Sequence, residues 1–245
     1  FYSFEKLYRC CKLKGIKTIL FIDDDLSAVP ESFLLYRISD FVIAPASCNP
    51  GKFKYKTFGF KGFKASAYLH PNSKIKINAD FPGYLRNQKY FLIRLVSLGA
   101  VHDIGKKGIS DTILVNIINK LKDYGTVLIN SQRPLKQEFE TYRISLNPVD
   151  MIHYIKNAEI FISDSQTMSS EAGLLGTPFI RFNDFVGKIG YLEEIEKKYR
   201  LGIGISADQP DMLLSAIDDL LKIKDLKKEW KIRLRILFYK QITIF

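Results

Sequence analysis

The sequence predicts an α/β protein whose strands form parallel sheets joined by helical crossovers. Short apolar runs with the length of buried strands alternate along the chain with segments of helical length and periodicity. Gly, Pro, Ser and Asp gather where these runs end, as expected for turns between strands and helices. The 245 residues are 47% hydrophobic and 26% charged, which is ordinary for a globular protein with a full core.

The first part of the chain alternates twice between helix and strand. The expected helices cover 2–13 and 31–39, and the expected strands cover 18–22 and 41–44. Gly15 ends the first helix, and three aspartates follow the first strand. This order is typical of a parallel sheet with crossovers.

Residues 50–70 have a different composition. Five lysines interleave there with aromatic residues and glycines. A single-strand nucleic-acid binder stacks bases on such rings and holds the backbone with such cations, and a loop facing lipid or sugar carries the same residues. A surface loop anchored by a few aromatic rings explains the pattern as well. Residues 71–88 resemble a linker, so we expect a partial first domain over 1–80 and a second domain over 81–245.

The alternation restarts at Lys89 and continues to the end of the chain. The expected strands cover 90–96, 126–130, 142–145, 160–162, 179–180 and 201–205. The expected helices cover 111–124, 148–157, 167–175, 191–199, 209–222 and 225–239. The chain therefore reads as two α/β layers, the second complete and the first cut short.

The composition narrows the classes of function. The net charge is +11, and residues 1–89 carry 15 Lys and Arg against 7 Asp and Glu. Such a basic half suits nucleic acid, anionic lipid head groups or a phosphorylated substrate. The three cysteines and three histidines have no disulfide or metal-ligand spacing, so we expect no metal site and a reducing, cytoplasmic setting. No apolar run has the length of a membrane span, and no signal-peptide pattern is present.

The sequence begins in the middle of a predicted element. Phe1 stands where an initiator Met is expected, and residues 1–14 read as the interior of a helix. We therefore expect a further N-terminal segment in the natural protein.

The turn between the strand at 160–162 and the next helix is the first candidate site. Residues 164–167 place carboxylate, hydroxyl and amide side chains where the helix begins. Backbone N–H groups and the helix dipole favour an anion such as phosphate at this position. Simple capping of the helix by Ser165 explains the same residues.

Two more loops are expected beside this turn, because ligands of open α/β sheets bind outside the carboxyl ends of the strands. One is 97–110, with several glycines and His102; the other is 130–134. Glu171 lies about one turn into the helix, where its two oxygens could accept from the two hydroxyls of a ribose. A dipole-compensating carboxylate is the alternative.

These residues carry a resemblance to a known family. Asp164-Ser165, Glu171-Ala172 and Leu175-Gly176-Thr177-Pro178, followed by Arg181, resemble the nucleotide-binding signature of UDP-GlcNAc 2-epimerases. More broadly they are similar to the second domain of GT-B glycosyltransferases. Over almost the whole chain the sequence resembles the DUF354 group of that superfamily. Short motifs such as Asn183-Asp184-Phe185-Val186-Gly187-Lys188 look characteristic of that group.

The resemblance implies a fold and a set of site residues. The fold is GT-B-like, with two Rossmann-like parallel-sheet domains, of which the N-terminal one is truncated. Its implied nucleotide-binding residues are His102, Ser165, Gln166 and Thr167 for the diphosphate, Glu171 for the ribose, and Arg181 of the same signature.

The resemblance is weaker in the first domain. Asp23 and Glu31 lie roughly where the epimerases keep catalytic acids, and either could act as a general base. A solvated cluster of residues 23–25 at a helix start is the preferred explanation of Asp23. The epimerase turn has two glycines where this chain has Gln166 and Thr167, which hinders close backbone approach to a diphosphate.

The leading expectation is a nucleotide-sugar-binding, glycosyltransferase-like protein of surface polysaccharide or glycan synthesis. Its substrate would be a UDP-linked sugar with a glycan or lipid-linked acceptor, and no further cofactor is implied. It would work in the cytoplasm, with peripheral attachment to the inner membrane face as an option. The alternatives are a sugar-nucleotide 2-epimerase and a non-catalytic binder of nucleic acid or an anionic surface, with nucleic acid the less favoured partner.

Overall fold

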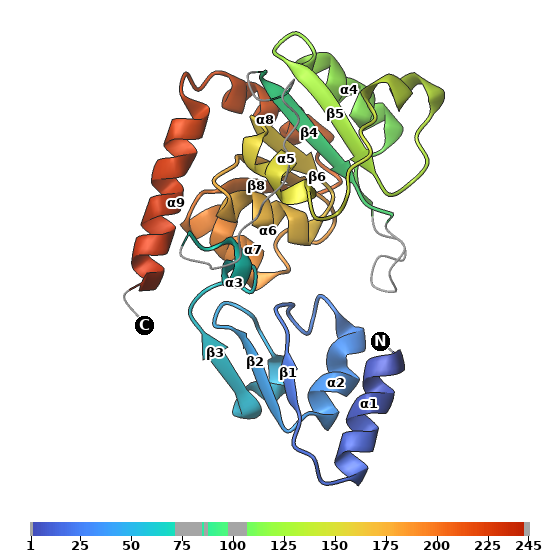
Figure 1. Cartoon of the computed structure of the whole chain (residues 1–245), viewed down its shortest axis with the longest axis vertical. Helices are drawn as coiled ribbons and strands as arrows, with labels where there is room; N and C mark the ends of the chain where they lie inside the picture. Colours follow the sequence, from blue (N-terminus) through green and yellow to red (C-terminus); the bar gives the residue numbers. More distant parts are fainter. Residues whose placement is uncertain (1, 72–84, 86–87, 98–106, 243–245) are drawn as a thin grey trace.

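The structure contains two parallel sheets that follow one another along the long axis of the molecule (Figure 1). It is a computed structural model, which describes residues 2–71, 85, 88–97 and 107–242. The strands of the smaller sheet are β1 (Ile19–Phe21), β2 (Phe41–Pro45) and β3 (Thr57–Phe60), in the order β1-β2-β3. The larger sheet has the order β5-β4-β6-β7-β8. The α/β class with parallel sheets is thus confirmed.

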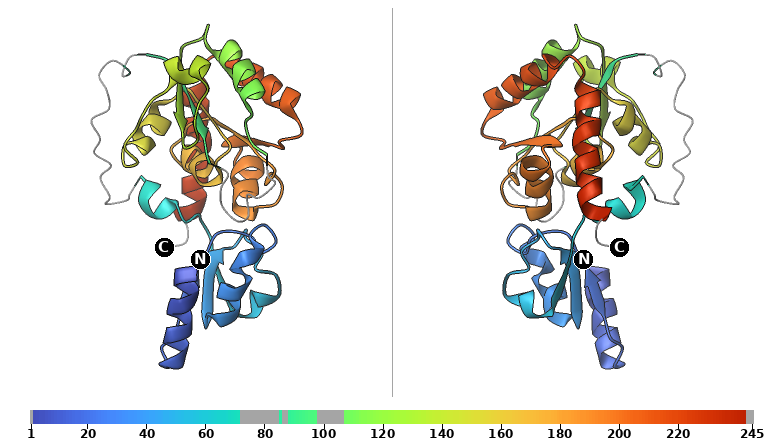
Figure 2. Two further views of the ribbon diagram at one scale, coloured as in Figure 1. Left: turned by 90° about the vertical axis from the view of Figure 1, so that its right-hand side faces the viewer. Right: turned by 90° about the vertical axis from the view of Figure 1, so that its left-hand side faces the viewer.

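The strands and helices of the second part match the expected order closely. Its strands are β4 (Tyr90–Leu95), β5 (Thr126–Ser131), β6 (Ile160–Ser163), β7 (Phe179–Phe182) and β8 (Gly202–Ile205). Its helices are α4 (Asp111–Leu121), η5 (Gln137–Tyr142), α5 (Met151–Asn157), α6 (Gln166–Leu174), α7 (Gly190–Glu193), η6 (Glu194–Lys198), α8 (Pro210–Leu221) and α9 (Leu226–Ile242). Strands β4, β6 and β7 are buried throughout, as consecutive apolar residues require in a sheet covered on both faces. Helices α4 and α8 pack together on one face, and α5 and α6 on the other (Figure 2).

The first part of the chain folds around the smaller sheet. Its helices are α1 (Tyr2–Leu13), η1 (Pro30–Ser32), α2 (Phe33–Ile38), η2 (Gly51–Lys56) and α3 (Ser66–Leu69). One face of the sheet packs against α2 and η2 through a small core of Leu20, Leu35, Tyr36, Val42 and Phe53.

The opposite face of the smaller sheet is open. Phe21 and Phe58 are 51% and 61% exposed there, and Ile19 and Phe41 are also exposed. Phe21 stacks on Phe60 with ring centroids 5.6 Å apart. The apolar strands expected at 18–22 and 41–44 are therefore buried on one face of the sheet and exposed on the other.

Three expected elements differ from the structure. The expected strand at 142–145 is a single bridge between Ile129 and Arg143, because the chain only touches the sheet edge as it leaves η5. The helix expected from Pro148 begins at Met151, and Asp150 is its N-cap. Within residues 50–70, β3 pairs with β2 along its whole length, so this segment is partly a strand of the sheet.

The expected domain boundary at residues 80/81 falls within residues 72–84, which lie outside the described residues. The largest apolar core contains Ala44 and Phe63 of the first part together with residues of all the later strands. Among the described residues, no helix is long and apolar enough to span a bilayer.

Candidate functional site

The turn between β6 and α6 is held by a chain of serine hydrogen bonds. The Ser163 hydroxyl donates to the Arg94 carbonyl of β4 at 2.9 Å and accepts from the Ser165 N–H at 2.8 Å. The Ser165 hydroxyl caps α6 by accepting from the Met168 N–H at 3.3 Å. The helix thus begins where the sequence predicted, and Ser165 has the capping role that was the alternative interpretation.

Within the described part of the chain, the Ser165 cap leaves the first two N–H groups of α6 available to a ligand. The backbone N–H groups of Gln166 and Thr167 have no acceptor inside the helix, because the first turn of any α-helix lacks one. Ser169 and Ser170 donate to carbonyl oxygens of their own helix, at 2.6 and 2.7 Å. Gln166 is half-buried and Thr167 is exposed, so these side chains border the open N–H groups. An anion fits this arrangement.

Glu171 lies one turn further along α6 and faces the first part of the chain. The Tyr68 hydroxyl of α3 donates to Glu171 Oε1 over 2.6 Å. Burial raises the pKa of Glu171, while the Tyr68 hydrogen bond and the charge of Lys64 oppose that rise. Glu171 is half-buried, and it accepts the Tyr68 hydrogen bond at the junction of the two sheets.

Asp23 is an acidic residue of the first part that also reaches this junction. Lys64 Nζ donates to Asp23 Oδ1 at 2.6 Å, and the Asp23 side chain is 13% exposed. Lys64 precedes Tyr68 by one helical turn, so one short segment contacts both Asp23 and Glu171. Glu31, the other expected acid, lies in the first turn of η1 within the same β1–α2 connection.

Asp25 forms a hydrogen bond across the junction between the two parts of the chain. Its Oδ1 accepts from the Asn49 N–H at 2.9 Å, and its Oδ2 accepts from the Gly190 N–H of α7 at 2.6 Å. Asp25 is buried, and a Cβ on Gly190 would lie 1.9 Å from the Ser47 carbonyl oxygen. The carboxyl end of β1 therefore lies directly against the second part of the chain.

His102 lies outside the described residues, so its expected contact with a diphosphate stays a prediction. The described end of its loop does reach the expected edge of the sheet. The Lys107 N–H donates to Asp184 Oδ2 at 2.8 Å. Gly108 approaches Asp164 so closely that a Cβ there would lie 2.8 Å from Oδ2.

Asp164 is buried beneath that loop. Its Oδ1 accepts from the Val96 N–H at 2.8 Å, and Oδ2 lies 3.6 Å from Arg133 Nη1. Burial raises the pKa of Asp164 to about 6, against the lowering effects of the Val96 hydrogen bond and the Arg133 charge. The three loops expected at this edge thus meet in the structure. Residues of 107–109 and of 131–133 both contact Asp164, which lies in the third loop, 163–167.

A cavity of about 380 Å³ opens beside the start of α6. Its polar lining includes Arg94 and Asn130, and its apolar lining includes Ile144, Leu146 and Met168. Arg94 Nη1 donates to Asn130 Oδ1, and Asn130 Nδ2 donates to the Ile144 carbonyl at 3.0 Å. The size and the mixed lining suit a flat heterocycle with a few hydrogen-bonding groups.

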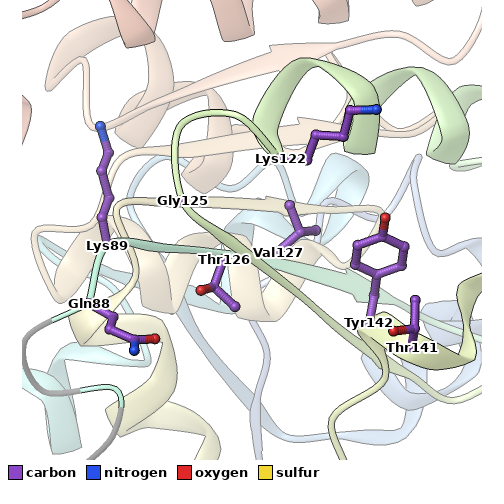
Figure 3. A pocket seen from close by; sticks show the side chains of 8 residues that line it. All are labelled: Gln88, Lys89, Lys122, Gly125, Thr126, Val127, Thr141 and Tyr142. Atoms are coloured by element: carbon purple, nitrogen blue, oxygen red, sulfur yellow. The ribbon is translucent and has the colours of Figure 1, made fainter.

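A larger hollow of about 610 Å³ lies at the opposite edge of the same sheet (Figure 3). Its lining includes Lys89, Thr126 and Tyr142, from the amino ends of β4 and β5 and the end of η5. Ligands of open α/β sheets bind at the carboxyl ends of the strands. We therefore assign the candidate site to the smaller cavity and the start of α6.

Arg181 lies away from this surface. Its guanidinium donates to both oxygens of Glu196, with Nε to Oε1 at 2.7 Å and Nη2 to Oε2 at 3.0 Å. The residue is fully buried, and Nη1 donates to Asn183 Oδ1. Arg181 could contact a nucleotide only by breaking its ion pair with Glu196. The nucleotide contacts proposed below therefore do not include Arg181.

Two residues of the site, Tyr68 and Arg94, were not predicted from the sequence. Tyr68 was one aromatic residue among many, and its contact with Glu171 joins residues 103 positions apart. Arg94 carried a usable signal, because a charged side chain inside a buried apolar strand requires a partner or a function.

Comparisons with known proteins agree with the geometry. Residues 15–186 match the family model described as "Protein of unknown function (DUF354)". No curated protein sequence matches the chain at a significant level.

Solved structures with the same GT-B fold resemble the chain at low sequence identity. UDP-GlcNAc 2-epimerase of Methanocaldococcus jannaschii, solved with UDP-GlcNAc and UDP, is 18% identical with a TM-score of 0.58, over 95% of this chain and 72% of that one. Another UDP-N-acetylglucosamine 2-epimerase is 15% identical with a TM-score of 0.57, over 91% and 62%. The spinosyn rhamnosyltransferase SpnG, solved with thymidine diphosphate, is 11% identical with a TM-score of 0.58, over 95% and 66%.

Proposed function

The chain belongs to the DUF354 family, and from the geometry of its site we propose that it binds a nucleotide-sugar and acts as a glycosyltransferase-like protein of surface polysaccharide or glycan synthesis. The observation that carries the proposal is the alignment of three features along α6. The open N–H groups at its start, the cavity beside Met168 in its first turn and the half-buried Glu171 one turn later all lie at the carboxyl edge of the sheet. A nucleotide needs three such environments, one each for its diphosphate, its base and its ribose.

Each part of a nucleotide has chemically matched partners here. The N–H groups and side chains of Gln166 and Thr167, with the Ser165 cap and His102, would hold the diphosphate. The two oxygens of Glu171 would accept from the ribose hydroxyls. The cavity lined by Asn130 and Met168 would hold the base.

The structural neighbours support a nucleoside diphosphate as the ligand. The epimerase neighbour was solved with UDP-GlcNAc and UDP, and the rhamnosyltransferase neighbour with thymidine diphosphate. We propose a UDP-linked sugar as donor and a glycan or a lipid-linked sugar as acceptor. We also propose that the protein works in the cytoplasm, where it would reach lipid-linked acceptors at the inner face of the membrane.

A sugar-nucleotide 2-epimerase is the second candidate, and Asp23 favours it. Epimerisation by proton abstraction needs a carboxylate near the sugar. Asp23 is held at the junction by Lys64, one helical turn from the tyrosine that binds Glu171. Asp23 or Glu31 would then be the base, whereas a transferase would use the same place for its acceptor.

The test is a calorimetric titration of UDP and 2′,3′-dideoxy-UDP into the wild type, Glu171→Gln and Glu194→Gln. Glu194 pairs with Lys198 on the surface and serves as the control. Hydrogen bonds to a charged group contribute roughly 1.5–3 kcal/mol each, so Glu171→Gln should weaken UDP binding by tenfold or more. It should leave the dideoxy compound, which lacks both hydroxyls, unaffected. Equal losses for both compounds, or binding of neither by the wild type, would overturn the ribose role.

The nucleic-acid alternative receives less support from the aromatic residues of 50–70. Phe53 and Phe63 are buried as anchors, and Lys52 and Lys56 lie over the Phe53 ring. These two rings have no open face for a base, whereas Tyr55 and Phe58, which are 81% and 61% exposed, do offer one. The alternative is tested by retention on single-stranded DNA at low salt, where a binder of this class would be released steeply as salt rises.

A further inference from the structure

Four ionisable side chains form one cluster at the junction of the two sheets. Asp23 and Glu171 come from opposite sides, and Lys64 and Tyr68 come from the segment between them. The hydrogen bonds Lys64–Asp23 and Tyr68–Glu171 are both 2.6 Å long. The four groups also act on one another through space, since Lys64 lowers the pKa of Glu171 and Asp23 contributes to raising the pKa of Tyr68.

We propose that Lys64 and Tyr68 form a clasp that nucleotide binding opens, so that Asp23 is released for chemistry only when the nucleotide site is filled. This inference rests on the proposed function, because it takes Glu171 as the ribose ligand. It adds two residues, Lys64 and Tyr68, that link the nucleotide site to the acid across the junction.

The first step is a competition for Glu171. Tyr68 occupies Oε1 with a short hydrogen bond to a charged acceptor. A ribose that engages both carboxylate oxygens with its two hydroxyls needs the same acceptor. The Tyr68 hydroxyl therefore acts as an internal substitute for a ribose hydroxyl, and the nucleotide must displace it.

The second step is transmission to Asp23. Lys64 and Tyr68 are four residues apart in the turns that lead into and form α3, so both side chains leave the same side of one short segment. A shift of α3 that removes Tyr68 from Glu171 also moves the backbone of Lys64. Lys64 Nζ is then no longer held against Asp23 Oδ1, and the carboxylate becomes available to accept a proton.

The junction stays assembled while the clasp opens, because other contacts hold it. Asp25 binds the Gly190 N–H, and the Phe63 ring meets Tyr199 edge-on at 6.2 Å. Neither contact involves the side chains of Lys64 or Tyr68. Opening the clasp therefore requires movement of one short segment and no separation of the sheets.

The affinity test uses Tyr68→Phe, which removes the hydroxyl and keeps the ring. The control is Tyr55→Phe, in the same segment and 81% exposed. Titration with UDP should show about tenfold tighter binding for Tyr68→Phe, because the competing hydrogen bond is gone, and no change for the control. Unchanged or weaker binding by Tyr68→Phe, with the dependence on Glu171 intact, would overturn the clasp and leave the proposed function standing. Absence of binding by both wild type and Tyr68→Phe would refute the proposed function itself.

The transmission is tested on the wild-type protein, so no variant needs to fold. Lys64 is acetylated with an amine-reactive reagent at limiting dose, with and without saturating UDP, and the modification is quantified by mass spectrometry. Lys61, an exposed lysine of the same segment, is the internal control. UDP should raise the labelling of Lys64 severalfold relative to Lys61. A labelling ratio that stays constant or falls when UDP binds would show that Lys64 remains on Asp23.

Discussion

The backbone N–H of Gly190 donates to Asp25 Oδ2 over 2.6 Å and thereby joins the start of α7 to the loop that follows β1. The approach is so close that any side chain on Gly190 would collide with the Ser47 carbonyl. Position 190 thus requires glycine for reasons of space, and the Asp25 carboxylate requires that N–H as a partner because it is buried.

Gly190→Ala is expected to destabilise the protein by about 1–3 kcal/mol or more, because backbone must move to admit the Cβ. Equilibrium unfolding in urea measures the change. Gly59→Ala is the matched control, since a Cβ there meets Ala46 at an ordinary 3.4 Å and strands favour alanine over glycine. Equal stability of Gly190→Ala and wild type would show that the junction is looser than the structure has it.

Asp164 should make the protein less stable as the pH rises from 4 to 7. Its pKa is about 6 in the folded protein and 3.8 in the unfolded chain, so the folded state binds the proton more tightly. The resulting stabilisation is complete below pH 3.8 and is lost as the pH rises through 6, by about 3 kcal/mol at most. Urea unfolding of wild type and Asp164→Asn across this range should show a stability difference that changes by that amount.

Asp40→Asn is the comparison for Asp164→Asn, because the pKa of Asp40 is shifted in the opposite direction. The Thr18 N–H bond lowers the pKa of Asp40 to about 2, so its contribution is present above pH 3.8 and lost as the pH falls toward 2. Its difference from wild type should be flat between pH 5 and 7. A flat profile for Asp164→Asn as well would contradict the raised pKa of Asp164.

The buried Arg181–Glu196 pair predicts a non-additive result. Arg181→Met leaves the Glu196 carboxylate buried without its partner and should cost about 3–5 kcal/mol. Glu196→Leu leaves Arg181 with the more distant Glu193, whose Oε1 lies 3.8 Å from Nη2, and should also destabilise the protein. The double variant should be more stable than either single one. Lys222→Met, which breaks an exposed pair with Asp219, should change stability by less than about 1 kcal/mol. UDP titration of the folded double variant tests the nucleotide role that the resemblance implies for Arg181, since a ligand role demands weaker binding.

The open face of the smaller sheet should bind an apolar dye such as ANS. The double change Phe21→Ser and Phe58→Ser is expected to reduce dye fluorescence while altering stability by about 1 kcal/mol or less, because both rings are largely exposed. Val42→Ser, on the covered face of the same sheet, should instead destabilise by several kcal/mol. Unchanged dye binding after the double substitution would show that the face is covered in solution.

The sequence allowed the larger sheet to be predicted well, because its strands are compact apolar runs. Tyr90–Leu95 and Ile160–Ser163 are buried on both faces, which consecutive apolar residues require. β3 was not expected, because Gly59 and the surrounding lysines resemble a loop, and only pairing with β2 makes Thr57–Phe60 a strand. The strand expected at 142–145 reaches the sheet at one bridge only, between Arg143 and Ile129.

The candidate site was predictable where its chemistry is local. Ser165 and Glu171 lie within one strand–turn–helix unit, so their spacing alone places them along one helix. The contacts of Tyr68 and Asp25 join residues more than 100 positions apart, and depend on how the two sheets meet. No local periodicity encodes that arrangement.

The hydrogen bond between Asp25 and Gly190 also limits how far Asp23 moves when the two sheets rotate relative to each other. Two residues of extended chain span at most about 7 Å, so a 10° rotation of one sheet about the Asp25 backbone displaces the Asp23 backbone by about 1.2 Å at most. Groups farther from the bond sweep a proportionally longer arc. A carboxylate held this near the pivot would therefore shift less than the outer parts of either sheet in any such rotation.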